Sequence, residues 1–259
     1  MAEQPLILVT NDDGVHSRGL RVLREAASTL GHVVVVAPSH EQSASSHAIT
    51  IDRPLRHEQH EQDVHSIDGT PADCVYLALF EPRFLPRRPT LVLSGVNHGL
   101  NIGTSVFYSG TIAGAREASL RGISAMAFSH DGAADGAWIV EVVRSMVARM
   151  LASQEGVSLI SVNLPAERPR GARVARVSRQ VYEEHVIPRR DPGGREYFWI
   201  GGELVQGPEV EGSDRQAIDQ GYASVTPLQL EATRADDMGL ARSIAADDNA
   251  ALAVTGEAS

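Results

Sequence analysis

Apolar and polar positions along the first two thirds of the chain predict strands and helices in alternation. Strands are predicted where short, β-branched apolar runs occur, at 6–10, 32–38, 89–95, 123–129 and 157–165. Helices are predicted where apolar or small residues recur at helical spacing between these runs, at 17–30, 70–80, 111–122 and 137–153. Ser17 is a suitable N-cap for the first helix. This alternation predicts an α/β fold with an open, mostly parallel sheet and helices on both faces.

The pattern changes after residue 165, where short alternating runs are broken by proline and glycine. Such runs favour β-hairpins over further strand–helix units, with one late strand expected at 221–230. We therefore predict a core that carries the catalytic site, a hairpin-rich oligomerisation arm, a strand and helix that return to the core or to a partner subunit, and a partly disordered tail. The boundaries of these four parts are 1–165, 166–212, 213–240 and 241–259.

Composition narrows the class of protein. The 259 residues are 42% hydrophobic and 22% charged, which is typical of a globular protein. A net charge of −10 argues against a nucleic-acid or anionic membrane partner, so we interpret the arginine- and aromatic-rich segment 189–200 as part of the arm. No apolar run approaches the roughly 18 residues of a membrane span, and we find no signal peptide. With Cys74 as its single cysteine, the chain has no internal disulfide, and we expect it in the cytoplasm.

The basic residues are all arginine, 23 in number, and the chain contains no lysine. This excludes a P-loop, which needs a lysine on the phosphates, and Schiff-base chemistry. Any bound phosphate must therefore be held by arginine, backbone N–H groups, polar side chains or a metal ion.

Two adjacent acids, Asp12 and Asp13, directly follow the first predicted strand. In an open α/β sheet, ligands bind beyond the carboxyl ends of the strands. Neighbouring carboxylates are tolerated there if one is protonated, if arginine pairs with them, or if a cation lies between them. Mg²⁺ and Mn²⁺ favour such oxygen ligands. Asn-Asp-Asp-Gly is also good turn chemistry, so this stretch alone leaves a metal site and a plain turn open.

Polar loops follow two further strands. Segment 39–50 is rich in hydroxyl groups, and the glycine-rich segment 95–111 ends in Ser109, Gly110 and Thr111 at the start of a predicted helix. Backbone N–H groups and hydroxyls at a helix start can hold phosphate oxygens without a lysine. A surface loop is the alternative for any one of these segments. Three polar loops at one sheet edge together indicate a metal-plus-phosphate site.

A series of motifs between residues 6 and about 230 resembles, in order, the SurE family of survival-protein 5′-nucleotidases. The motifs are ILVTNDDGVHSRGL, VVAPSHEQSASSHAIT, DGTPADCVYLAL, LVLSGVNHGLNIGTSVFYSGTIAGAREASLRGISAMAFS, SVNLP, DPGGREYFWIGG and GYASVTPLQL. The resemblance implies a Rossmann-like three-layer core and a metal-dependent phosphohydrolase acting on nucleoside 5′-monophosphates, and it leaves open whether 3′-monophosphates and polyphosphate are also substrates. It also implies a homodimer or homotetramer with an exchanged hairpin in the region 165–208.

The resemblance also implies the site residues. One divalent ion per subunit, Mn²⁺ or Mg²⁺, would be held by Asp12, Asp13, Ser43 and Asn97. The substrate phosphate would be bound by Asn101, Ser109, Gly110 and Thr111.

The expected reaction is displacement at a phosphate monoester, in which positioning and charge neutralisation supply most of the catalysis. We interpret Asp12 as the catalytic residue that ligates the metal and accepts the proton of the attacking water, with a direct nucleophilic role left open. His16, His47 and His98 lie in or beside the site loops and are candidate general acids. Orienting or surface roles for them, and protonation by water, are the alternatives.

The sequence departs from the family pattern at two positions: Ala44 stands where glycine is usual, and Ser39 where aspartate is common. Alanine disfavours positive φ, so the serine loop is either shaped differently or does not need glycine. The alternatives to a nucleotidase are a phosphatase for a specialised-metabolite phosphate and a non-catalytic nucleotide-binding protein. The absent lysine disfavours a phospho-receiver domain, and the absent Gly-x-Gly-x-x-Gly turn disfavours a dinucleotide-dependent oxidoreductase.

Overall fold

The computed structural model describes residues 4–132, 136–153, 155–179, 181–205, 210–231 and 235–253. The chain divides into two units, Met1–Leu228 and Gln229–Ser259. The strands are β1 (Leu6–Thr10), β2 (His32–Pro38), β3 (His57–Glu61), β4 (Val64–Ile67), β5 (Leu91–His98), β6 (Ala125–His130), β7 (Leu159–Leu164), β8 (Ala172–Val174), β9 (Val181–Arg190), β10 (Glu196–Val205) and β11 (Ala223–Pro227). The helices are α1 (Arg18–Ser28), α2 (Pro71–Phe80), α3 (Ser105–Tyr108), α4 (Gly110–Leu120), α5 (Ala137–Ala152), α6 (Asp214–Asp219) and α7 (Met238–Ala253), with a 3₁₀ turn at Ala235–Asp237.

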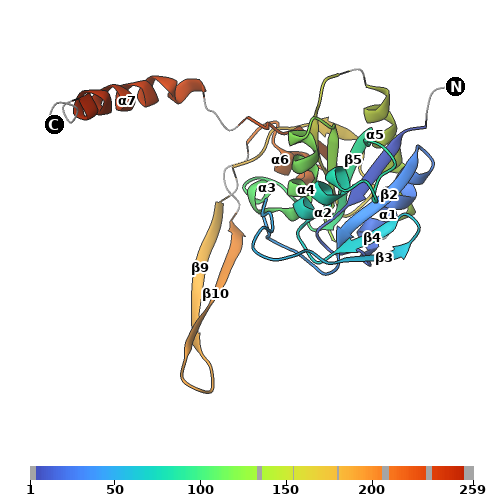
Figure 1. Ribbon diagram of the computed structural model, residues 1–259, viewed down its shortest axis with the longest axis horizontal. Helices are drawn as coiled ribbons and strands as arrows, with labels where there is room; N and C mark the ends of the chain where they lie inside the picture. Colours follow the sequence, from blue (N-terminus) through green and yellow to red (C-terminus); the bar gives the residue numbers. More distant parts are fainter. Residues whose placement is uncertain are drawn as a thin grey trace. The chain divides into compact units, whose positions relative to one another are not determined.

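The first unit is built on a large twisted sheet with helices packed against it (Figure 1). The sheet has nine strands in the order β3-β4-β2-β1-β5-β6-β7-β11-β8. All neighbours from β4 to β7 pair in parallel. At the margins, β3 runs antiparallel to β4 and β11 antiparallel to β7. The chain moves outward from β1 to β2 and β4 and then returns to β5 on the other side of β1. The crevice between β1 and β5 is therefore the topological switch point, where doubly wound sheets bind their ligands.

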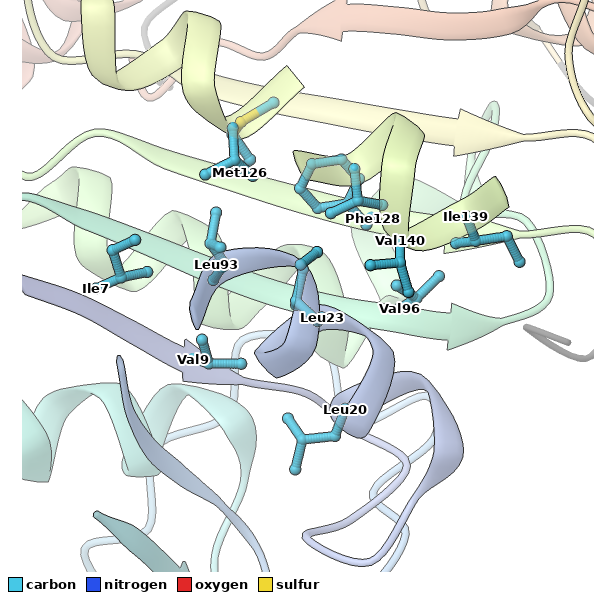
Figure 2. Packing of buried hydrophobic residues seen from close by; sticks show 14 of the residues in the cluster. Ile7, Val9, Leu20, Leu23, Leu93, Val96, Met126, Phe128, Ile139 and Val140 are labelled. Carbon is cyan, nitrogen blue, oxygen red and sulfur yellow. The ribbon is translucent and has the colours of Figure 1, made fainter. Parts of the chain in front are cut away.

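Helices cover both faces of this sheet, as predicted. Helices α1 and α5 pack on each other on one face, and α2 and α4 on the other. In Figure 2, Ile7 and Val9 of β1 lie toward Leu20 and Leu23 of α1, and Phe128 of β6 lies toward α5. Every residue of β1 is buried, because helices cover its alternate side chains on both faces.

Helix α4 lies close to the sheet because its inward residues are small. A Cβ on Gly114 would lie 2.9 Å from Thr10 Cγ2 and 3.2 Å from Ser94 Oγ, so the helix axis sits against β1 and β5. The predicted helix 111–122 therefore occurs, starting one residue earlier at Gly110. This close approach brings the start of α4 to the switch point.

The strands and helices predicted from apolar periodicity are all present, with ends shifted by a few residues. The predicted N-cap is confirmed, since the Ser17 hydroxyl accepts a hydrogen bond from Leu20 N at 3.2 Å. The pattern did not indicate β3, because its sequence HEQHE is polar and exposed throughout. A strand held at a sheet edge by backbone pairing alone carries no apolar signature.

The predicted arm, 166–212, contains the hairpin of β9 and β10, which forms a long antiparallel ribbon of its own (Figure 1). It also contains β8, which pairs in parallel with β11 of the main sheet. Of the predicted tail, residues 241–253 lie in α7, and residues 254–259 lie outside the described residues. Across the part of the chain that the structure describes, no helix is long and apolar enough to cross a membrane.

Candidate active site

The loop after β1 is shaped by Asn11, which is fully buried. Its amide Nδ2 donates to the carbonyl of Gly14 at 3.1 Å and to the Ser17 hydroxyl at 2.7 Å. Gly14 adopts a φ of 95°, which an L side chain rarely tolerates. These contacts turn the chain from β1 into α1 and leave the two following acids at the strand end.

The Asp12 carboxylate lies between the acidic loop and the start of α4. Thr111 donates its hydroxyl to Asp12 Oδ1. A Cβ on Gly110 would lie 2.9 Å from Asp12 Cβ and 3.1 Å from Asp12 Oδ2, so only glycine allows α4 to start this close. Burial raises the pKa of Asp12 from 3.8 to about 6, with the charge of Asp13 adding to the rise and the Thr111 hydroxyl opposing it.

Asp13 is half-buried and lies beside the end of β5, where the backbone N–H of His98 donates to its carboxylate. Burial raises the pKa of Asp13, and the nearby Glu41 carboxylate raises it further. From the sequence, an ion pair with arginine was one of three ways in which the two neighbouring carboxylates could be tolerated. Among the described residues, no arginine is one of the groups that shift either pKa. Protonation or a cation therefore remains to relieve the buried negative charge.

The serine loop, residues 39–50, packs against the acidic loop after β1 and against α3, which precedes α4. Gln42 N donates to the backbone oxygen of Asp12 at 2.8 Å, and Ser46 Oγ donates to the carbonyl of Phe107 at 2.8 Å. Ser43 is exposed, and its hydroxyl donates to Glu41 at 2.7 Å. Ala44 has a φ of 56°, so the residue that replaces the usual glycine does occupy the left-handed region.

The serine loop also supplies a residue that the sequence did not indicate, Ser45. Its Oγ is buried and, within the described part of the chain, has no hydrogen-bond partner. A Cβ on Gly110 would lie 2.9 Å from this Oγ, which places the hydroxyl next to Asp12 at the start of α4. A buried hydroxyl that is free to donate, beside a carboxylate whose burial raises its pKa, suits a polar ligand.

Asn97 and Asn101 come from the end of β5 and the loop that follows it. Asn97 Nδ2 donates to the carbonyl of Gly99 at 2.8 Å, which leaves the amide oxygen as the atom it can offer to a cation. Asn101 is buried, and its Nδ2 donates to Ser129 Oγ at 2.9 Å. Asn163, at the end of β7, accepts from Asn101 N at 2.8 Å and donates to Asn101 O at 3.2 Å. Asn163 therefore fixes the glycine-rich loop through its backbone.

The start of α4 carries the other predicted phosphate contacts. Ser109 is the N-cap, and its hydroxyl accepts from Ile112 N at 3.1 Å. The Thr111 hydroxyl is used by Asp12, as described above. The structure thus brings Asp12, Gly110 and Thr111 into direct contact, joins Asp13 to the end of β5, and positions Asn101 through β6 and β7.

The three candidate histidines differ in their surroundings. His47 Nε2 lies 2.9 Å from the carboxylate of Glu117, which is buried in α4. The His16 ring contacts the ring of His60, with their centroids 5.1 Å apart. His98 is exposed and next to Asp13. The carboxylate of Glu117 therefore orients the His47 ring, whereas His98 is the candidate histidine that lies beside the acidic pair.

The donor set fits one hard divalent cation. Within the described residues, no group of three or more His, Cys, Asp and Glu side chains is placed to hold a metal ion. The site offers instead two adjacent carboxylates, with the hydroxyls of Thr111 and Ser45 beside Asp12, and oxygen donors of this kind are the ligands that Mg²⁺ and Mn²⁺ prefer. A cation here would also offset the burial of Asp12, which raises its pKa to about 6 despite the hydrogen bonds from Thr111.

Comparison with known families gives a match over most of the chain. The family described as Survival protein SurE matches residues 7–184. The chain belongs to the SurE family. It is 46% identical over 252 residues to a protein named 5′-nucleotidase SurE from Sorangium cellulosum, covering 95% of this chain and 98% of the relative. It is 44% identical over 240 residues to 5′-nucleotidase SurE 1 from Thermus thermophilus, covering 88% and 92%.

A solved SurE structure has the same fold. The crystal structure of the SurE protein from Aquifex aeolicus superposes with a TM-score of 0.81 at 38% identity. The match covers 93% of this chain and 99% of that one. The Rossmann-like, mostly parallel α/β fold predicted from the sequence is thereby confirmed, and so is the family resemblance.

Proposed function

We propose that this chain is a metal-dependent phosphomonoesterase that hydrolyses nucleoside 5′-monophosphates to nucleoside and phosphate. The observation that carries the proposal is the buried Asp12 beside Asp13, at the switch point of the sheet and against the start of α4. The SurE relatives, which are named 5′-nucleotidases, support the same activity.

The metal would be held by Asp12, Asp13, Ser43 and Asn97, as one Mn²⁺ or Mg²⁺ ion per subunit. When bound, such an ion supplies charge neutralisation for the phosphate and lowers the pKa of a coordinated water. The raised pKa values of both acids support this assignment, because burial outweighs the hydrogen bonds of Thr111 at Asp12 and the lowering effect of His98 at Asp13.

The substrate phosphate is bound by Asn101, Ser109, Gly110 and Thr111 in this proposal. The N-terminal N–H groups of α4 suit an anion, since they have no partner within the helix. Ser45, with its buried and unpartnered hydroxyl, adds one more donor next to Gly110. Holding the phosphoryl group in line with the attacking water is the main task of these residues.

Asp12 accepts the proton of the attacking water. Thr111 fixes Oδ1 of its carboxylate, which leaves Oδ2, on the side of Gly110, as the accepting atom. Without a metal ion, burial raises the pKa of Asp12 to about 6, and a bound cation would lower it again so that the carboxylate is ionised and able to accept the proton. His98 is the histidine best situated to protonate the leaving alkoxide, and bulk water is the alternative donor.

We further propose that the enzyme is cytoplasmic and forms a homodimer or homotetramer through its hairpin. Phe198, Trp199 and Ile200 of β10 are 61%, 64% and 91% exposed, which is unfavourable unless a second subunit covers them. Sedimentation of the wild type and of Trp199→Glu tests this. The variant is expected to dissociate to smaller species, and an unchanged sedimentation coefficient would remove the hairpin from the interface.

The activity is tested by phosphate release from 5′- and 3′-nucleoside monophosphates, short polyphosphate and sugar phosphates. Each substrate is assayed with Mn²⁺, Mg²⁺ or EDTA, beside Asp12→Asn. Metal-dependent release from nucleotides, lost in the variant, is expected. Phosphate release from other phosphomonoesters but not from nucleotides would be consistent with the proposed mechanism and would overturn the proposed substrate class. Near wild-type turnover by Asp12→Asn would overturn the role of Asp12, and no release from any substrate would favour a binding protein.

A further inference from the structure

Asp214, a buried aspartate that the proposed mechanism does not use, begins α6. Asp214 is 1% exposed. Its Oδ2 accepts from Gly103 N at 3.1 Å, and its Oδ1 accepts from Ser178 N at 2.9 Å and from Arg215 N at 2.8 Å. One carboxylate therefore joins three segments that lie far apart in the sequence.

Capping of α6 does not account for this carboxylate. The N-cap is Ser213, whose hydroxyl accepts from Gln216 N at 3.2 Å. Asp214 is the next residue, and its carboxylate reaches out of the helix to Gly103 and Ser178. A buried carboxylate that binds backbone N–H groups of two other segments specifies how those segments lie relative to each other.

Gly103 belongs to the glycine-rich loop that carries Asn101. The loop is fixed at Asn101 by Asn163 and two residues later at Gly103 by Asp214. Gly103 has a φ of 56°, so the loop turns sharply at the point that Asp214 holds. The backbone of this loop is thus held by two buried side chains, Asn163 from β7 and Asp214 from α6.

Ser178 lies three residues before β9, at the base of the hairpin. The strands that enter and leave the hairpin are joined there. Arg176 N donates to Gly212 O at 2.9 Å, and Asp214 N donates to Arg176 O at 2.9 Å. The Asp214 carboxylate adds the bond to Ser178, so the base of the hairpin and the glycine-rich loop share one anchor.

We propose that Asp214 is a positioning residue that couples the phosphate-binding loop to the base of the hairpin. A displacement at the hairpin base moves the carboxylate and, through Gly103, the loop that carries Asn101. The link to phosphate affinity rests on the proposed function, whereas the mechanical link between the two segments does not.

Amide hydrogen exchange tests the mechanical link without any substrate. In the wild type, the loop 99–104 and the hairpin base 176–179 are expected to open together, with protection that matches within a few fold. Asp214→Asn removes one acceptor and places an amide donor against a backbone N–H, so protection should fall about tenfold or more in both segments. The matched control is Asp219→Asn, an exposed aspartate of the same helix that pairs with Arg215 at 2.8 Å.

Kinetics test the link to phosphate. In Asp214→Asn, the KM for the substrate and the inhibition constant of inorganic phosphate should each rise about tenfold, while the Mn²⁺ concentration for half-maximal activity stays unchanged. If Asp214→Asn lost protection in one segment alone, or in neither, the coupling would be overturned. If the variant fails to fold, the wild type decides the question, because protection that differs strongly between 99–104 and 176–179 would also overturn the coupling. A lower melting temperature with unchanged KM would reduce Asp214 to a structural residue. If the wild type releases no phosphate, the proposed function fails and the exchange result still decides the coupling.

Discussion

The loop after β1 and the start of α2 each bury an aspartate at the same edge of the sheet. Asp12 is 4% exposed and Asp73 is 2% exposed. The Asp73 carboxylate accepts from Thr50 N at 2.8 Å, Thr50 Oγ1 at 2.7 Å and Thr70 N at 2.9 Å. Asp12 has the Thr111 hydroxyl and the adjacent charge of Asp13, and its pKa is raised to about 6.

The difference between these two aspartates separates a structural acid from a functional one. Donors on both oxygens of Asp73 compensate its burial, and they close a capping box at the start of α2. Hydrogen bonds from Thr111 compensate the burial of Asp12 only in part, and the neighbouring Ser45 hydroxyl has no partner among the described residues. A buried carboxylate whose charge is only partly compensated suits a cation site, whereas a buried carboxylate whose oxygens all accept hydrogen bonds specifies the fold.

Asp73→Ala is expected to give the largest loss of stability, about 3–5 kcal/mol, because it leaves the donors of the partly buried Thr50 and the buried Thr70 without an acceptor. Urea denaturation at pH 7 measures the loss. The control is Asp52→Ala, an exposed position near the same loop, which should stay within about 0.5 kcal/mol of the wild type. A loss of less than about 1 kcal/mol in Asp73→Ala would contradict the claim that Asp73 is a structural acid.

Gly110→Ala should displace the Asp12 carboxylate without changing its charge. The added methyl would lie 2.9 Å from both Asp12 Cβ and Ser45 Oγ, so the carboxylate and the serine loop must shift. We expect a loss of about 1–3 kcal/mol in stability and a fall in kcat/KM of between about tenfold and a hundredfold. Gly156→Ala is the control, since nothing lies within 4 Å of its new Cβ. Full activity in Gly110→Ala would mean that the start of α4 is not part of the site.

Glu117→Gln should give the smallest effect and a pH dependence of known sign. Burial raises the pKa of Glu117, but hydrogen bonds from His47 and Arg121 more than offset this, and the pKa lies below its ordinary 4.5. Its contribution, about 1 kcal/mol, is therefore present at pH 7 and is lost as pH falls through the lowered pKa. Denaturation curves of both proteins at pH 7 and pH 3.5 measure it. A difference in the free energy of unfolding between the wild type and Glu117→Gln that is larger at pH 3.5 than at pH 7 would contradict the assignment.

The sequence predicted the parallel sheet and its helices because β1, β2 and the amphipathic helices bury apolar residues at regular spacing. It also indicated the site, because Asp12 and Asp13 interrupt an apolar run at a strand end. Asn163, in the motif SVNLP, gives the same signal, because it is a polar residue at the end of an apolar strand.

Other parts of the site could not be predicted from local pattern. Ser45 is one of several hydroxyl residues in its loop, and only the close approach of Gly110 singles it out. Asp214 lies 111 residues from Gly103 in the sequence, and the contact between them depends on the complete fold. Long-range hydrogen bonds of buried side chains leave no periodic trace in the sequence.

The central claim is that Asp12 is a buried carboxylate that needs a cation, and the stability of metal-free protein tests it most directly. Because the folded state raises the pKa of Asp12 from 3.8 to about 6, it binds a proton more tightly than the unfolded chain does. Stability should therefore fall as pH rises through this window, by up to about 3 kcal/mol.

Urea denaturation of the wild type and Asp12→Asn at pH 8, with EDTA and with Mn²⁺, is the measurement. With EDTA, the variant is expected to be the more stable protein, because asparagine carries no charge to bury. With Mn²⁺ at about 100 times its dissociation constant, the wild type alone should gain about 2.7 kcal/mol, which narrows or reverses the difference. A wild type that is the more stable protein in EDTA, or an equal gain from Mn²⁺ in both proteins, would contradict the account.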